Sequence, residues 1–259
     1  MLRKLLKYDF RSMGKQFALL WPAALVLALV NRFTLPGNGS GFAGETLGFV
    51  AAMTYFGVVV ALFVITLIFV IQRFYYGLLG GEGYLMHTLP VKPWQLVASK
   101  LICAVVTSLI SLVVAFLSMF LLVPVSWDSF LTTGTFTALR ILVTERPDVL
   151  LLAVEILLVF VAALSAGILM VYLAMALGHL FPRNRVAGSV LSFLGINIAV
   201  NILMSAAATF IPDVNLDQWL TVQQSAHVSM WLMTLCLAAF AAASFAGTVA
   251  ILRRKLNLE

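Results

Sequence analysis

The sequence has very little charge and very little polar surface. Only 10% of its 259 residues are Asp, Glu, Lys or Arg, 63% are hydrophobic, and the mean hydropathy is +1.08. Soluble domains are about half apolar and about a quarter charged, so this composition excludes a water-soluble globule. The net charge of +6 cannot belong to a soluble basic face. We therefore expect a lipid bilayer as partner and no nucleic acid.

The sequence also lacks the motifs of several enzyme and cofactor classes. Cys103 and Cys236 lie inside apolar runs, so no disulfide framework is expected. His87, His179 and His227 are scattered, with no HExxH motif and no cysteine partners, and no metal site is predicted. A Walker A loop, GxxxxGKS or GxxxxGKT, is absent. We therefore predict no catalytic residue and no cofactor in this chain.

What the sequence has is six long apolar runs. A helix needs about 20 residues to span a hydrocarbon core of about 30 Å, and lipid cannot satisfy open backbone groups, so the spans must be helical. The sequence predicts an all-α, polytopic integral membrane protein with six transmembrane helices in one domain over residues 1–259. The predicted spans are about 17–35, 47–71, 101–123, 149–177, 186–211 and 228–252.

The distribution of basic residues predicts the orientation. If both termini are cytoplasmic, 13 of the 16 Lys and Arg residues lie inside, and only Arg32, Arg140 and Arg146 lie outside. The reverse topology would contradict the positive-inside rule. We therefore expect cytoplasmic N- and C-termini in a multi-pass protein.

Residues 1–16 form a basic amphipathic helix on a helical wheel. Leucines, Phe10 and Met13 share one arc, and the lysines and arginines share the opposite one. Such a helix is expected to lie in the cytoplasmic interface as an elbow, with Gly14 allowing a bend into the first span. Asp9 breaks the pattern because it projects into the apolar arc. A buried carboxylate needs a partner, so Asp9 either lies at headgroup depth or docks onto the second or third span.

Three polar residues inside the spans are functional candidates. Asn197 and Asn201 are four residues apart near mid-bilayer, and so share one face of the fifth helix. They are expected to line a cavity or a helix interface. Glu155 lies either at the outer interface or inside the bilayer, where it must be protonated or paired.

The segment 72–100, between the second and third spans, is unusually complex for a short cytoplasmic loop. It contains paired glycines, a lone acid at Glu82, a short apolar-aromatic face, and prolines at 90 and 93. Pro90 ends a short helix, Pro93 suits the first turn of the next one, and Lys100 is expected at the membrane surface. A helix of one or two turns with a mixed face is suited to a groove on another protein.

The opening LLKYDF, the elbow, and the positions Glu82, Leu89-Pro90-Val91 and Lys100 together resemble ABC-2 type transporter permeases. The resemblance covers the whole layout and is strongest to the compact six-span permeases of clostridial-type bacteria. It implies a bacterial cell membrane protein, a second permease subunit (identical or paralogous), and a separate ABC ATPase that holds ATP and Mg. Cargo, an antimicrobial peptide or another amphipathic compound, would be exported by alternating access. The residues implied in coupling to the ATPase are Glu82, Tyr84, Leu85, Met86, His87, Leu89 and Pro90.

Two other classes stay open at this stage. An intramembrane enzyme such as a six-span protease needs a Ser–His pair or paired carboxylates, and in the sequence Glu155 stands alone while His227 is expected near the outside. A sensory or capture subunit without a pore is the other alternative. An ABC ATPase gene beside this one would favour the permease.

Overall fold

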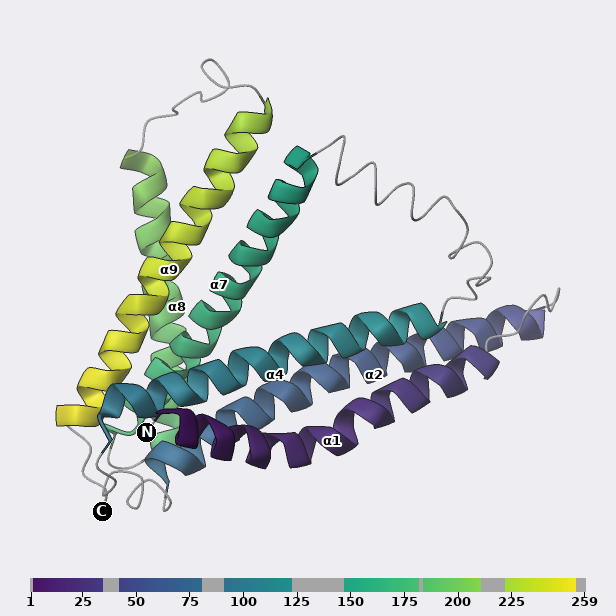
Figure 1. The fold of residues 1–259 in the computed structure, drawn as a ribbon, viewed down its shortest axis with the longest axis horizontal. Coiled ribbons are helices and arrows are strands. Elements are labelled where there is room, and N and C mark those ends of the chain that lie inside the picture. Colours follow the sequence, from purple (N-terminus) through teal and green to yellow (C-terminus); the bar gives the residue numbers. More distant parts are fainter. Residues whose placement is uncertain are drawn as a thin grey trace. The chain divides into compact units, whose positions relative to one another are not determined.

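The computed structural model describes residues 2–34, 42–80, 91–122, 147–181, 184–210 and 222–254, and every secondary-structure element in these ranges is helical. In the described residues these elements are six α-helices and one short π-helix, and the α-helices are labelled in Figure 1. They are α1 (Leu2–Thr34), α2 (Phe42–Phe74), η1 (Tyr75–Leu79), α4 (Pro93–Leu122), α7 (Pro147–Gly178), α8 (Arg185–Phe210) and α9 (Val222–Arg254).

The prediction of an all-α, six-span membrane protein is confirmed. Six helices among the described residues are long and apolar enough to cross a membrane, and each overlaps most of one predicted run. Their side chains explain the composition, because large apolar residues such as Phe49, Phe116 and Leu203 lie on the outside of the chain. In water that exposure would be unfavourable, whereas in a bilayer the same surface contacts hydrocarbon.

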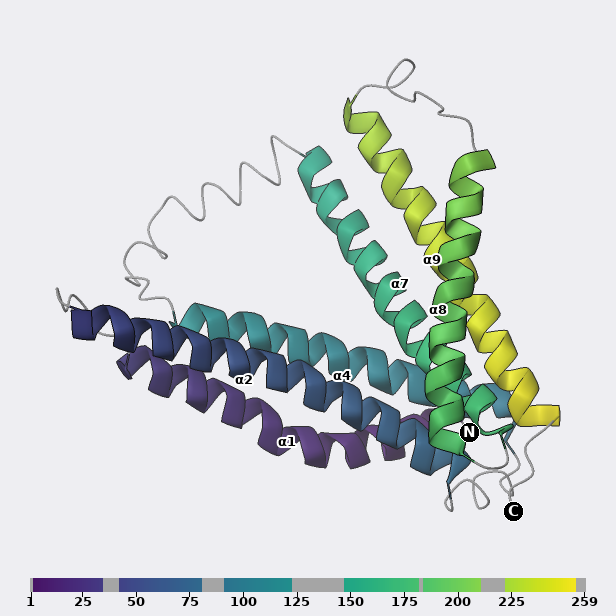
Figure 2. The same ribbon diagram turned by 180° about the vertical axis from the view of Figure 1, so that it is seen from behind.

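The boundary between elbow and first span is not marked by a break in the helix. α1 is continuous from Leu2 to Thr34 through Gly14, and it curves along its length (Figures 1 and 2). A helical glycine costs about 1 kcal/mol relative to alanine. The neighbouring Met13 and Phe17 are fully buried, and their packing keeps this part of the chain helical. Pro22 lies inside α1 and is a recognised cause of helix bending.

The described residues group into two compact units. Unit 1 is formed from 1–73 and 102–140, and unit 2 from 74–101 and 141–259. In unit 1, α1, α2 and the part of α4 from Ile102 onward lie alongside one another (Figures 1 and 2). In unit 2, α7 packs against both α8 and α9. Sequence analysis expects one domain, and it does not indicate this grouping.

The core of unit 1 combines small apolar packing with hydrogen bonds between helices. Ala24, Leu62, Val114 and Ala115 form a buried cluster across the three helices. Beside it the indole Nε1 of Trp21 donates to Ser111 Oγ at 3.0 Å, and Thr66 Oγ1 lies 3.1 Å from the same oxygen. Hydrogen bonds of this kind within membranes average about 0.6 kcal/mol. These hydrogen bonds therefore fix how α1, α2 and α4 are aligned with one another, while packing supplies most of the stability.

Unit 2 uses small residues where α7 turns into α8. Gly178, the last residue of α7, lies directly against the backbone of Ser189, and Gly188 lies against the ring of Phe181. A Cβ atom at either glycine would collide with these neighbours. On the other side of α7, Gly247 of α9 lies against Leu173. Small residues at such contacts let helix backbones approach closely in a membrane.

Candidate functional site

The structure pairs Asp9 with Arg73, which is the last residue but one of α2. The Nη2 atom of Arg73 donates to Asp9 Oδ1 at 2.7 Å, and Asp9 is only 1% exposed. The guanidinium carbon also lies 5.4 Å from the centre of the Tyr8 ring. The partner is therefore a basic group at the end of the second span, where the sequence led us to look for it. Asp9 is therefore docked onto another helix through a buried ion pair.

The face of α1 around Asp9 packs against protein over two turns. Met13 and Phe17 follow Asp9 at four-residue spacing, and both are fully buried. Cys103 Sγ lies 3.3 Å from the Met13 sulfur, and the Phe17 ring makes an edge contact with Phe69. The N-terminal part of α1 thus packs against α2 and α4 along its apolar arc.

Directly after Phe74 the chain changes from α-helix to π-helix. The Gly80 N–H donates to the Tyr75 carbonyl at 2.7 Å, which is the i to i+5 pattern, and Gly77, Leu78 and Leu79 are buried. Sequence analysis assigns these residues to a loop, and this assignment is wrong. π-helical turns are rare and are frequent at functional sites. Here the turn ends the second span and leads into residues 81–90.

Gly77 of the π-helix leaves room for a buried lysine. Lys100 is 3% exposed, and a Cβ atom added to Gly77 would lie 3.2 Å from both its Cε and Nζ atoms. The hydroxyl of Tyr172 donates to the Lys100 carbonyl at 3.4 Å. Lys100 is therefore packed among neighbouring residues rather than exposed, and its expected place at the membrane surface stays a prediction.

Aromatic rings and a histidine complete the surroundings of the π-helix within unit 2. The rings of Phe74 and Tyr172 stack at 3.9 Å, and those of Tyr75 and His179 at 5.8 Å. The Nε2 atom of His179 is buried with no hydrogen-bond partner among the described residues. Burial, and then the charge of Arg185, lower the pKa of His179. This histidine is therefore held as neutral imidazole beside the π-helix.

The residues implied in coupling lie outside the described part of the chain. The structure describes both flanks, up to Gly80 and from Val91. The expected start of the following helix at Pro93 agrees with α4. The residues between the flanks that sequence analysis selects are Glu82, Tyr84, Leu85, Met86, His87, Leu89 and Pro90.

Glu155 and His227, which sequence analysis treats as isolated, form a pair near the N-terminal ends of α7 and α9. The Nδ1 atom of His227 lies 2.6 Å from Glu155 Oε2. Trp231, four residues further along α9, donates its indole N–H to Glu155 Oε1 at 2.9 Å. Glu155 is 4% exposed. Both carboxylate oxygens are thus bonded to one face of α9, and the description of His227 as unpaired is wrong.

This pair supplies only part of what an intramembrane enzyme of the Ser–His type requires. Such an enzyme needs a hydroxyl nucleophile within hydrogen-bond reach of the imidazole. Ser225 and Ser229 each lie two residues from His227 along α9, and the hydroxyl of Ser229 donates to the Ala226 carbonyl of its own helix.

Asn197 and Asn201 are not buried between the helices that the structure describes. Asn201 is exposed and Asn197 partly exposed. Each side-chain amide donates to the carbonyl four residues earlier in α8, from Asn197 to Phe193 O at 3.0 Å and from Asn201 to Asn197 O at 2.9 Å. Each amide therefore has a partner in its own helix, and the expectation that these residues line a cavity or a helix interface stays a prediction.

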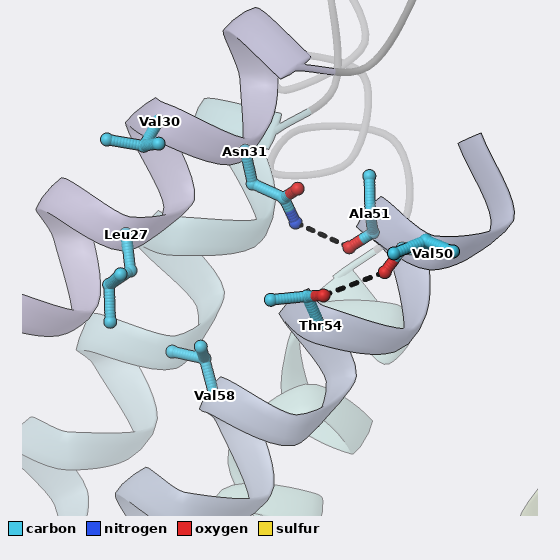
Figure 3. A pocket seen from close by; sticks show the side chains of 7 residues that line it. All are labelled: Leu27, Val30, Asn31, Val50, Ala51, Thr54 and Val58. Atoms are coloured by element: carbon cyan, nitrogen blue, oxygen red, sulfur yellow. Dashed lines mark hydrogen bonds between the residues drawn. The ribbon is translucent and has the colours of Figure 1, made fainter. Parts of the chain in front are cut away.

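A cavity of about 300 Å³ lies between α1 and α2 in unit 1 (Figure 3). The two polar side chains in it point at backbone carbonyls. Asn31 donates to Ala51 O at 2.7 Å, and Thr54 donates to Val50 O at 2.8 Å. The other side chains of the lining are aliphatic, so the cavity suits hydrocarbon and lacks the several polar groups that orient a polar ligand. The lining residues are Leu27, Val30, Asn31, Val50, Ala51, Thr54 and Val58.

Within the described residues, no group of three or more His, Cys, Asp or Glu side chains is placed to hold a metal ion. Comparison of the chain with protein-family models, with curated proteins and with solved structures finds no match.

Proposed function

We propose that this chain is the membrane permease subunit of an ATP-driven exporter of the ABC-2 type. The support from the sequence is the layout of an elbow, six spans and a complex loop between the second and third spans. The observation that carries the proposal is a contact that joins the N-terminal helix to the end of α2. Asp9 of the N-terminal helix is buried against Arg73, one residue before the chain leaves α2 for the π-helix.

The length of the second helical stretch supports a mechanical role. α2 and η1 have 33 and 5 residues, which is about 57 Å at 1.5 Å per residue. A hydrocarbon core takes only about 30 Å, so the stretch extends well beyond the bilayer. A helix that continues into an aqueous loop can transmit a displacement of that loop into the membrane as a rigid body.

In this proposal an ABC ATPase, with its ATP and Mg, binds the segment 81–90 on the cytoplasmic side of the bacterial cell membrane. A second permease subunit, identical or paralogous, completes the pathway. The N- and C-termini are cytoplasmic. The cargo is an antimicrobial peptide or another amphipathic compound that moves outward. These assignments follow from the resemblance of the sequence and from its charge distribution.

Substitution of Glu82 in the complete complex tests the proposal. Glu82→Gln keeps the size and much of the helix-capping ability of the side chain, and capping is worth only about 0.3–1 kcal/mol. If Glu82 is bound in the ATPase groove, we expect a loss of about tenfold in transport, the effect of about 1.4 kcal/mol, with normal membrane insertion. Glu45→Gln, the same change at the other end of α2, is the matched control.

The chain and the candidate ATPase must also co-purify in mild detergent. Wild-type transport in both Glu82→Gln and Glu82→Ala would remove this residue from the mechanism. A tagged chain that elutes alone, although the ATPase is co-expressed, would contradict the proposal as a whole.

A further inference from the structure

The Glu155–His227 pair lies in unit 2, at the end opposite to the π-helix and its lysine. Glu155 is the ninth residue of α7 and His227 the sixth of α9, so both are within about three turns of the helix N-termini. Under the expected topology these ends face the outside. The carboxylate is buried, while the imidazole side chain is 23% exposed. The imidazole ring therefore lies between the buried carboxylate and the surroundings of the helix ends.

The hydrogen-bond geometry allows two protonation states of the pair. With a neutral imidazole, Nδ1–H donates to Glu155 Oε2 and the pair carries one negative charge. With one more proton, the pair is neutral, either as imidazolium and carboxylate or with the proton on the carboxyl group. Histidine is the side chain that ordinarily changes charge between pH 5 and 8. A hydrogen bond between ionised partners is also shorter and stronger than one with a neutral donor.

Few other charges can compensate for this change. On α7 the one other acidic or basic residue is Asp148, seven residues before Glu155, and on the described part of α8 the one such residue is Arg185, at the opposite end. On α9 the basic residues Arg253 and Arg254 are also at the far end. Trp231 bonds the carboxylate but does not titrate. Binding of one proton therefore changes the net charge of the buried cluster from −1 to 0.

From this arrangement we infer that Glu155, His227 and Trp231 form a proton-binding site that links the N-terminal ends of α7 and α9. When the proton is bound, the pair is neutral and the charge-assisted bond holds the two helices together. When it is released, the buried carboxylate retains its charge with a neutral imidazole and the indole as donors, and the ends of the helices separate more easily. The ligand of the site is a proton from the solution that bathes these ends.

This inference goes beyond the proposed export function and needs no ATPase for its test. Spin labels are attached to cysteines at Leu151 and Val228, which are 53% and 43% exposed, in a chain lacking Cys103 and Cys236. Leu151 lies one turn before Glu155, and Val228 follows His227. The distance distribution between the labels is measured by pulsed spectroscopy on the purified full chain in lipid nanodiscs from pH 8.5 to pH 5.

We expect the distribution to become shorter and narrower as the pH falls, and this response to disappear in His227→Gln and in Glu155→Gln. Trp231→Phe keeps the titrating pair, so it should broaden the distribution at every pH while preserving the response. His179→Gln, which removes a histidine at the other end of unit 2, should leave the response unchanged.

A wild-type distribution that does not change between pH 8.5 and 5 would overturn the inference. So would a response that persists in His227→Gln or in Glu155→Gln, because the proton would then bind elsewhere. Since the measurement uses the isolated chain, loss of the inference would leave the coupling experiment on Glu82 unaffected, and the converse also holds.

Discussion

The Asp9–Arg73 contact predicts a large and specific loss of stability when either partner is removed. Exposed ion pairs contribute only about 0–1 kcal/mol, whereas removal of one partner of a buried pair costs about 3–5 kcal/mol. Asp9 is 1% and Arg73 15% exposed at the side chain, which places the pair much nearer the buried class. Arg73 bonds through Nη2, and its Nε atom is buried without a partner among the described residues.

We therefore expect Asp9→Leu and Arg73→Met each to cost about 3 kcal/mol, at the lower end of the range for buried pairs. The lower end is appropriate because Arg73 retains some solvent and the Tyr8 ring. The apolar double variant Asp9→Leu/Arg73→Met should cost much less than the sum of the single changes, because no charge is then left buried. A coupling energy of about 2 kcal/mol or more is expected.

The assay is equilibrium unfolding of the purified chain in mixed micelles, followed through the complete double-mutant cycle. Arg11→Met, a change at an exposed basic residue of the same helix, is the control and should stay within about 0.5 kcal/mol of the wild type. If the two single changes cost under about 1 kcal/mol each and add within about 0.5 kcal/mol, the contact is a surface pair. The N-terminal helix is then not docked through Asp9.

Two further predictions concern unit 2. Gly77→Val should destabilise the chain by about 1–3 kcal/mol through overpacking, because even a Cβ atom at this position lies 3.2 Å from the Lys100 side chain. The control is Gly57→Val, where nothing lies within 4 Å of an added Cβ atom. Equal losses of stability at both glycines would contradict the close approach. Burial and then Arg185 lower the pKa of His179 in the folded chain, so the unfolded chain binds more protons and stability must fall as the pH drops below about 6.5. His179→Gln should flatten this part of the melting-temperature profile between pH 7.5 and 5, and a profile identical to that of the wild type would refute it.

The spans were predictable because hydrophobic length is a local property of the sequence. Pro93 as a helix start was predictable for the same reason, since its missing N–H and fixed φ act on the chain locally. Asp9 was identified through a break in a local pattern, and its partner class followed from the cost of burying a charge. The continuity of α1 through Gly14 was not predictable, because it depends on the burial of Met13 and Phe17 against other helices.

The π-helix and the burial of Lys100 depend on contacts that no local pattern contains. Propensity does not distinguish the π-helical YYGLL from an ordinary helix end followed by glycines. The available signal was Gly77, a glycine one turn before Gly80. One short loop separates this segment from the helix that contains Lys100. Helical glycines often mark close approach of another group, but which group approaches is decided by the packing of α4, and this information is absent from the sequence of either segment.

The polar residues of the spans show how much further a physical reading of the sequence can go. A side-chain amide has donors, so Asn197 and Asn201 can each bond to the carbonyl four residues earlier and need no second helix. An ionised carboxylate has only acceptors, and beyond the first four residues a helix has no free N–H to offer it. Glu155, the ninth residue of α7, must therefore obtain its donors from a neighbouring helix.

That requirement could have been used to search the sequence. Two donors on one helix face stand four residues apart, and they must lie at a depth similar to that of the carboxylate. Glu155 lies about 12 Å from the start of α7, and His227 and Trp231 lie about 8 and 14 Å from the start of α9, at 1.5 Å per residue. Both helices begin on the same side under the expected topology, so the carboxylate falls between the two donors. An ionised carboxylate deep in one span can only accept hydrogen bonds, so it predicts two N–H donors at a similar depth on another span. The Glu155–His227–Trp231 cluster satisfies that condition.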